Sequence, residues 1–99
     1  MKVEGKADTI PDATDLLNHN IVFHAGLDVN LQTLDFTNIQ WVDLGNDQFE
    51  FNLDLDMGTF LQGSNPFDLA NEYTSHSMVG QEAITLKIMQ KFKEAITPQ

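Results

Sequence analysis

The chain of 99 residues contains no cysteine and no arginine, and it has a single tryptophan. Without cysteine, neither a disulfide framework nor a thiolate metal site can form, and nothing marks an oxidising compartment. No apolar run approaches the ~18 residues that a membrane-spanning helix needs, and the N-terminal sequence lacks the apolar core of a signal peptide. We therefore expect a soluble, cytoplasmic protein with no membrane partner.

Positive charge is absent from most of the chain. From Ala7 to Leu86 there are thirteen carboxylates and no lysine, and the five lysines lie within residues 1–6 and 87–93. A net charge of −10 repels nucleic acid and anionic lipid and attracts basic proteins and cations. Direct nucleic-acid binding is therefore not expected, although adaptation to a saline habitat would also explain the acidity.

The strand signals come from alternating apolar and polar residues. Apolar side chains occupy every odd position of residues 21–31 and again of residues 49–57, a period of two that is typical of half-buried strands. Between them, Gly45-Asn46-Asp47 has the residue types of a hairpin turn that joins residues 37–44 to 47–57. These patterns predict an antiparallel β-meander of three to four strands.

The helix signals are concentrated in the C-terminal third. Apolar residues at spacings of three and four predict a helix from Gln81 to Ile96 that packs on one face of the sheet. Asn65-Pro66 predicts a second, short helix near residues 66–73, and a further helical turn is predicted around residues 11–18. The result is an α+β fold in one domain over residues 1–99. The apolar stripe of the C-terminal helix is Ile84, Ile88, Phe92 and Ala95.

No catalytic or metal-binding motif stands out. The segment from Asp54 to Gly58 does not match a calcium loop, because its glycine falls at the fifth position and a third oxygen ligand is missing. The three histidines do not cluster, as a transition-metal site requires, and Ser75-His76-Ser77 lacks the surrounding nucleophile-elbow motif. We expect no catalytic residue, no bound metal and no cofactor. An enzyme remains open only if the fold builds a pocket around the acids, His24 or His76.

Carboxylates alternate with apolar residues along the predicted strand of residues 49–57. Every second side chain of a strand lies on the same face, about 6.7 Å from the next, so this strand would carry a regular row of negative charge. DNA presents one phosphate per 3.4 Å of each strand, which makes the row comparable but sparser in charge. We expect the following acids to bind a partner: Asp28, Asp43, Asp47, Glu50, Asp54 and Asp56.

Two functions are compatible with these patterns. The first is a non-enzymatic acidic interaction protein that binds a basic surface of another protein, such as a nucleic-acid-binding enzyme, by mimicking nucleic acid. Phage-encoded nuclease inhibitors and anti-CRISPR proteins share this size and charge, which is an analogy of properties alone. The alternative is a structural or assembly module, including a homo-oligomer, that acts through strand edges or an apolar patch. That patch would consist of Phe60, Leu61, Phe67 and Tyr73.

Overall fold

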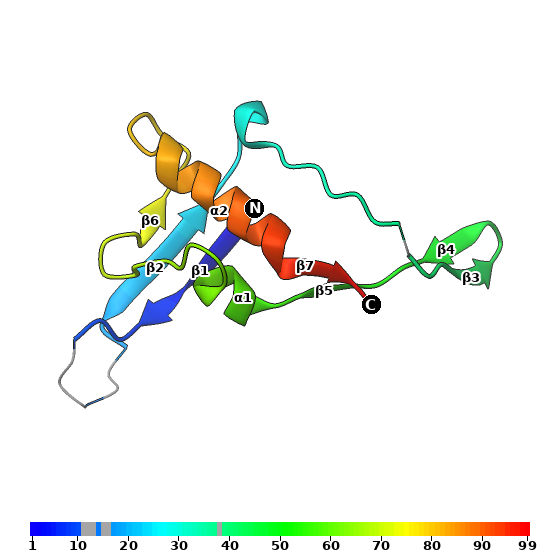
Figure 1. Ribbon diagram of the computed structural model, residues 1–99, viewed down its shortest axis with the longest axis horizontal. Coiled ribbons are helices and arrows are strands. Elements are labelled where there is room, and N and C mark those ends of the chain that lie inside the picture. The colour runs from blue at the N-terminus through cyan, green and yellow to red at the C-terminus, as the bar shows by residue number, and fades with distance from the viewer. Residues whose placement is uncertain (11–13, 15–16, 38) are drawn as a thin grey trace.

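The computed structural model describes residues 1–10, 14, 17–37 and 39–99. The fold class is α+β, with antiparallel strands, a C-terminal helix and one short helix (Figure 1), as the sequence predicts. No helix among these residues is long and apolar enough to cross a membrane. The elements in chain order are β1 (Lys2–Ala7), β2 (His19–His24), the 3-10 helix η1 (Asp28–Asn30), β3 (Val42–Gly45), β4 (Gln48–Glu50), β5 (Leu53–Leu55), α1 (Met57–Gln62), β6 (Thr74–Ser75), α2 (Glu82–Ala95) and β7 (Ile96–Pro98).

The body of the protein is a three-stranded sheet packed against the two helices. β2 lies in the middle, antiparallel to β1 and parallel to β6. Three phenyl rings meet behind it, because the ring of Phe67 lies 4.8 Å from that of Phe23 and 5.5 Å from that of Phe60. The buried apolar core therefore joins β2 to α1 and α2. Its members are Ile21, Phe23, Ala25, Phe60, Phe67, Ile88 and Ala95.

The predicted C-terminal helix is confirmed as α2. Two residues of the predicted stripe, Ile88 and Ala95, are buried, and the other two are half-buried. Thr85 and Lys91 also lie on the buried side. The hydroxyl of Thr85 is 2.7 Å from that of Ser75 in β6, so a hydrogen bond between hydroxyls supplements the apolar contacts between helix and sheet.

The first predicted strand, residues 21–31, ends early at His24. Lys2 of β1 pairs with His24, Met1 exchanges two backbone hydrogen bonds with Ala25, and the next amide, that of Gly26, donates to the side chain of Ser77 instead of to a strand. The chain then turns at Leu27, whose φ is 70°, and continues into η1. Leu27, Val29 and Leu31 are exposed as a result, although the alternating pattern predicts a buried face for them.

The second predicted strand, residues 49–57, is also divided. The predicted hairpin forms between β3 and β4, but β5 leaves it and pairs with β7 instead. Because β7 follows α2, this pairing joins residues more than forty positions apart, and such a contact leaves no trace in a local pattern. The described strands therefore form three separate sheets in place of the single predicted meander.

The short helix lies at Met57–Gln62, while residues 66–73 form turns and no helix. Asp56 begins α1 as an N-cap in the extended conformation, and its carboxylate accepts hydrogen bonds from the backbone of Gly58 and Thr59 at 2.8 and 3.2 Å. Asn65, the predicted cap, has a φ of 51°, which is incompatible with the extended backbone of an N-cap. The helical turn predicted near residues 11–18 falls mostly outside the described residues.

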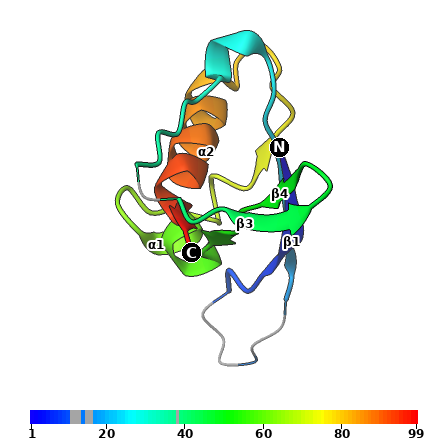
Figure 2. The same cartoon turned by 90° about the vertical axis from the view of Figure 1, so that its right-hand side faces the viewer.

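The molecule is elongated. Its radius of gyration is 16.6 Å and its longest dimension is 54 Å, whereas a compact chain of this length has a radius of gyration of about 13 Å. The β3–β4 hairpin projects from the body at the far end of this axis (Figure 1), and Figure 2 views the molecule from that end. The extra length is thus due to one hairpin and the extended segments that connect it.

Candidate interaction surface

The projecting hairpin, which we call the arm, comprises residues 41–51. β3 and β4 pair with each other and with no other strand of the described chain. Asn46 and Asp47 at the tip have φ values of 54° and 58°, the left-handed conformation of the tight turns that match strand twist. A two-stranded hairpin is only marginally stable by itself in water. Contact with another surface would therefore stabilise the arm.

One face of the arm is aromatic. The register places Asp43 opposite Phe49, and Trp41 and Phe51 meet beside them with their rings 4.8 Å apart. Trp41, Phe49 and Phe51 are 60%, 61% and 40% exposed. The period-two pattern thus indicates strand residues with an apolar face, but no described part of this chain buries that face.

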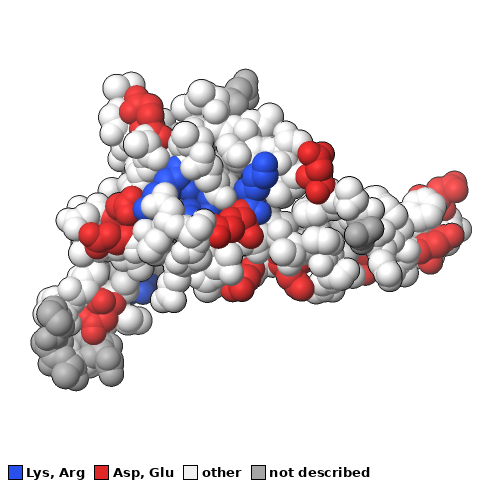
Figure 3. All heavy atoms as spheres, viewed as in Figure 1, with Lys and Arg blue, Asp and Glu red and all other residues white. Residues whose placement is uncertain are grey.

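Three carboxylates lie on the arm: Asp43 is on the aromatic face, Asp47 is at the turn, and Glu50 is on the opposite face, because successive strand residues alternate between faces. Asp43 accepts a hydrogen bond from the backbone of Gly45 at 2.8 Å, Asp47 lies in the turn, and Glu50 accepts one from Asn52 at 3.2 Å. None of the five lysines lies on the arm, and Figure 3 shows acidic side chains at its outer end. The structure therefore brings together three of the six acids predicted to bind a partner.

The other three predicted acids lie elsewhere. Asp54 belongs to β5 and accepts a hydrogen bond from the side chain of Gln99 at 2.6 Å, and Asp56 is the cap of α1. Asp28 is in η1, in another part of the molecule. The regular row of charge along a single strand is not formed, because the strand that would have carried it is divided.

No known protein family, curated protein or solved structure matches this chain.

The apolar patch predicted from Phe60, Leu61, Phe67 and Tyr73 does not form, because only Tyr73 among them is exposed. Phe60 and Phe67 belong to the core, and Leu61 packs against it. Tyr73 stacks edge-on against His19, with ring centroids 4.3 Å apart. Sequence alone could not separate these residues from the exposed aromatics of the arm, since both groups are apolar and lie near turn residues.

The histidine and serine side chains considered as catalytic candidates make contacts within the fold. The ring of His76 packs edge-on against that of His24, and the hydroxyl of Ser77 donates to the carbonyl of His24 at 3.2 Å. Glu4 lies 3.1 Å from His24, and hydrogen bonds from His24 and Lys2 hold the pKa of the Glu4 carboxyl below its usual value. Among the described residues, no group of three or more histidine or carboxylate side chains is placed to hold a metal ion.

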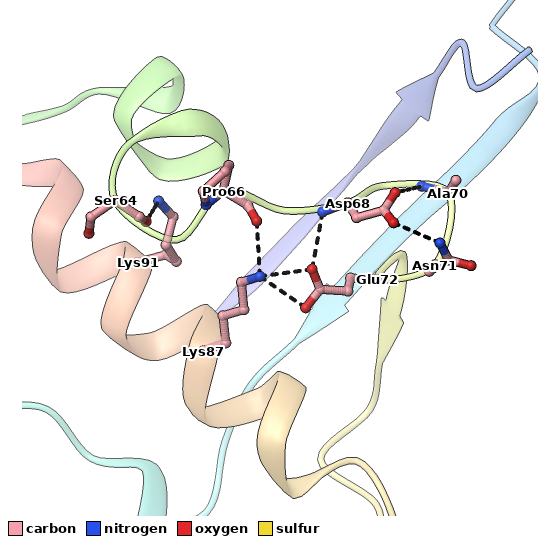
Figure 4. Close-up of polar contacts among 8 residues, drawn as sticks. All are labelled: Ser64, Pro66, Asp68, Ala70, Asn71, Glu72, Lys87 and Lys91. Carbon is pink, nitrogen blue, oxygen red and sulfur yellow. Dashed lines mark hydrogen bonds and ion pairs between the residues drawn. The ribbon is translucent and has the colours of Figure 1, made fainter.

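Two of the C-terminal lysines are engaged inside the body (Figure 4). The amine of Lys87 donates to both carboxylate oxygens of Glu72, at 2.8 and 3.0 Å, and to the carbonyl of Pro66. The amine of Lys91 donates to the carbonyl of Ser64 and lies 3.5 Å from Glu94. These lysines hold the segment of turns against α2.

We expect Asp56→Ala to lower the thermal unfolding temperature at neutral pH, because it removes the cap of α1. Hydrogen bonds from the amide and hydroxyl of Thr59, and from the amide of Gly58, hold the pKa of Asp56 below its usual value. The pKa is thus lower in the folded state than in the unfolded state, so this stabilisation is present at neutral pH and is lost as the pH falls through the folded value. Circular dichroism melts at neutral and acidic pH measure both effects.

Asp56→Asn is the matched control for the cap. Asparagine retains an acceptor oxygen and is an equally good N-cap residue, so its melting temperature should stay near that of the wild type and depend less on pH. An alanine variant as stable as the wild type at neutral pH would show that the cap does not contribute.

Proposed function

We propose that this chain is a non-enzymatic interaction protein that uses the arm as its contact surface. The observation that carries the proposal is the aromatic face of the arm, where Trp41, Phe49 and Phe51 are exposed on a hairpin that nothing in the described chain covers. Aromatic residues are enriched at protein interfaces and supply much of their binding energy. The contact thus combines the apolar patch of an assembly module with the acidic surface of a charge-directed binder.

The size of the exposed surface supports a stable contact. The accessible surface of the chain is 7050 Å², whereas a compact monomer of this mass exposes about 5,700 Å². The difference, ~1,400 Å², exceeds the ~800 Å² that each partner contributes to a standard interface. The arm contributes to this excess together with the exposed segments outside it, so covering it would remove part of the excess.

The charge on the arm specifies the chemistry of the partner. Asp43, Asp47 and Glu50 flank the apolar side chains, and no basic residue lies among them. Burying these carboxylates against a neutral surface would cost desolvation free energy, and an acidic surface would repel them. Lysines or arginines around an apolar groove would complement their charge. The partner is accordingly a protein with an apolar groove and a basic rim.

Capture from a lysate of the source cells tests the proposal. Three baits are compared: the wild-type chain, an arm variant with Phe49→Ser and Phe51→Ser, and a control variant with Val79→Ser. Val79 suits the control because it is 97% exposed and lies outside the arm. We expect a basic protein to be retained by the wild type and the control, to be lost with the arm variant, and to elute as salt rises. Equal recovery by all three baits would contradict the proposal.

Nucleic-acid mimicry is a narrower form of the same function. Its support is the cluster of Asp43, Asp47 and Glu50 on the arm, and it requires that competing DNA displace the captured protein. Replacing the three acids by Asn, Asn and Gln should abolish capture by a mimic, because the aromatic face would contribute little to it. If the aromatic face dominates, the same variant should only weaken capture and DNA should not compete.

A further inference from the structure

Four side chains form one block on the aromatic face of the arm. The register pairs Asp43 with Phe49 across the hairpin. Alternate strand residues share a face, so Trp41 and Phe51 lie beside this pair, and their rings are in contact at an angle of 66°. Glu50 alternates to the opposite face. The aromatic face therefore carries three exposed rings and one carboxylate.

The carboxylate of Asp43 has no counter-ion within the described chain. One of its oxygens accepts the hydrogen bond from the amide of Gly45, and no described lysine or histidine forms an ion pair with it. The five lysines of the sequence lie in the two terminal segments, away from residues 41–51. A negative charge is thus displayed beside exposed aromatic rings and is left for a cation from outside.

The rings of the block attract a cation as well. The face of an aromatic ring is electronegative, and tryptophan is the strongest of the three aromatic residues in holding a cation within about 6 Å of its centre. Trp41 is 60% exposed. Residues on one face of a strand are spaced by about 6.7 Å, so a cation over the Trp41 ring lies one step along the strand from Asp43. Both groups can therefore act on the same ligand.

A guanidinium group fits this block better than other cations do. It is planar and weakly hydrated, so it can stack on a ring while its N–H groups donate to a carboxylate. A lysine ammonium is strongly hydrated, and a quaternary ammonium has no N–H to donate to Asp43. Nucleic-acid bases also stack on exposed rings, but their phosphates would be repelled by an arm that carries three acids and no lysine.

We infer that the aromatic face of the arm is a binding site for an arginine side chain of the partner protein, with the guanidinium stacked on Trp41 and hydrogen-bonded to Asp43. The inference rests on the proposed function and names the chemical group that the arm recognises. Arginine is enriched among the residues that dominate binding at protein interfaces. The partner accordingly presents an arginine at the centre of the contact.

Titration of the full-length chain with short glycine–serine peptides tests the inference. The peptides have neutral ends and carry three arginines, three lysines, three trimethyllysines or three citrullines, the last being neutral analogues of arginine. Trp41, the single tryptophan, reports binding by its fluorescence, and NMR should show the arginine side-chain protons shifted upfield by the ring that they cover. We expect the arginine peptide to bind about three- to fivefold more tightly than each of the others.

Matched variants separate the aromatic face from the overall charge of the arm. Asp43→Asn removes the charge but keeps an acceptor oxygen for the amide of Gly45, and it should weaken binding of the arginine peptide about threefold. Glu50→Gln removes the same charge from the opposite face and should have a smaller effect. Trp41→Leu should remove most of the upfield shift of the arginine protons, because the stacked ring is lost.

Four results would overturn the inference. Equal binding of the arginine and lysine peptides, or equal weakening by Asp43→Asn and Glu50→Gln, would mean that the arm attracts any cation through its net charge. Tighter binding of the trimethyllysine peptide would replace arginine as the ligand, and the absence of binding would exclude the site. If the arm still captures a basic protein in any of these cases, only the arginine is wrong and the proposed function stands.

Discussion

Phe23→Ala should destabilise the protein far more than the loss of any exposed aromatic side chain. Phe23 is 0% exposed and contacts the rings of both Phe60 and Phe67, so the substitution opens a cavity where the sheet meets both helices. Phenylalanine-to-alanine changes in cores cost about 3–5 kcal/mol, a large part of the ~5–15 kcal/mol that stabilises a typical domain. Urea unfolding followed by circular dichroism should show a much lower midpoint or an unfolded chain.

Phe49→Ala is the matched control, since the same atoms are removed from a residue that is 61% exposed on the arm. Surface substitutions of this kind change the free energy of unfolding by about 0.5 kcal/mol or less. The two variants therefore separate folding from binding: one should lose stability, and the other should lose only the contact made by the arm. Equal losses of stability in the two variants would mean that the arm is part of the core.

Glu72→Gln should lower the free energy of unfolding by about 1–2 kcal/mol. Glu72 receives two hydrogen bonds from Lys87, and the Lys87 side chain is only 14% exposed. The amine of Lys87 also lies 4.9 Å from the centre of the Phe67 ring. Neutralising Glu72 leaves this poorly hydrated charge without its counter-ion. Chemical unfolding at neutral pH measures the loss, and Glu50→Gln on the arm provides an exposed control.

The effect of Glu72 should disappear in acid. The hydrogen bonds from Lys87, helped by one from the backbone of Asp68, hold the pKa of Glu72 below its usual value. Because the folded pKa is lower than the unfolded one, the carboxylate stabilises the protein above the unfolded value and loses this effect as the pH falls through the folded value. Wild type and Glu72→Gln should converge in stability at low pH. A difference that does not change with pH would rule out the ion pair as its cause.

Several elements could be predicted from local sequence because local physics forms them. The α2 helix follows from apolar residues at spacings of three and four, and the β3–β4 turn follows from Gly45-Asn46-Asp47, whose residues tolerate a positive φ. The buried face of β2 follows from alternation over residues 21–25. In each case, the interactions that define the element lie within a few residues of one another.

The errors came from interactions between distant residues. The sequence of β1, with three charged residues and a glycine, has a weak strand pattern, and the strand depends on β2 as a partner. The alternation over residues 49–57 is regular and predicts one continuous strand, whereas the pairing partner changes from β3 to β7 between Glu50 and Leu53. The N-cap at Asn65 was predicted from residue type, while its backbone adopts a different conformation.

The sequence by itself determined the charge of this protein, the α+β class, the C-terminal helix and the hairpin, because composition and short-range periodicity are enough for these. Only the tertiary structure decided which apolar residues are buried. Phe23 and Phe49 both lie in alternating runs, yet Phe23 is buried in the core that β2 shares with both helices and Phe49 is exposed on the arm. Burial depends on which distant segments cover a strand, and for the arm no described segment of its own chain does so.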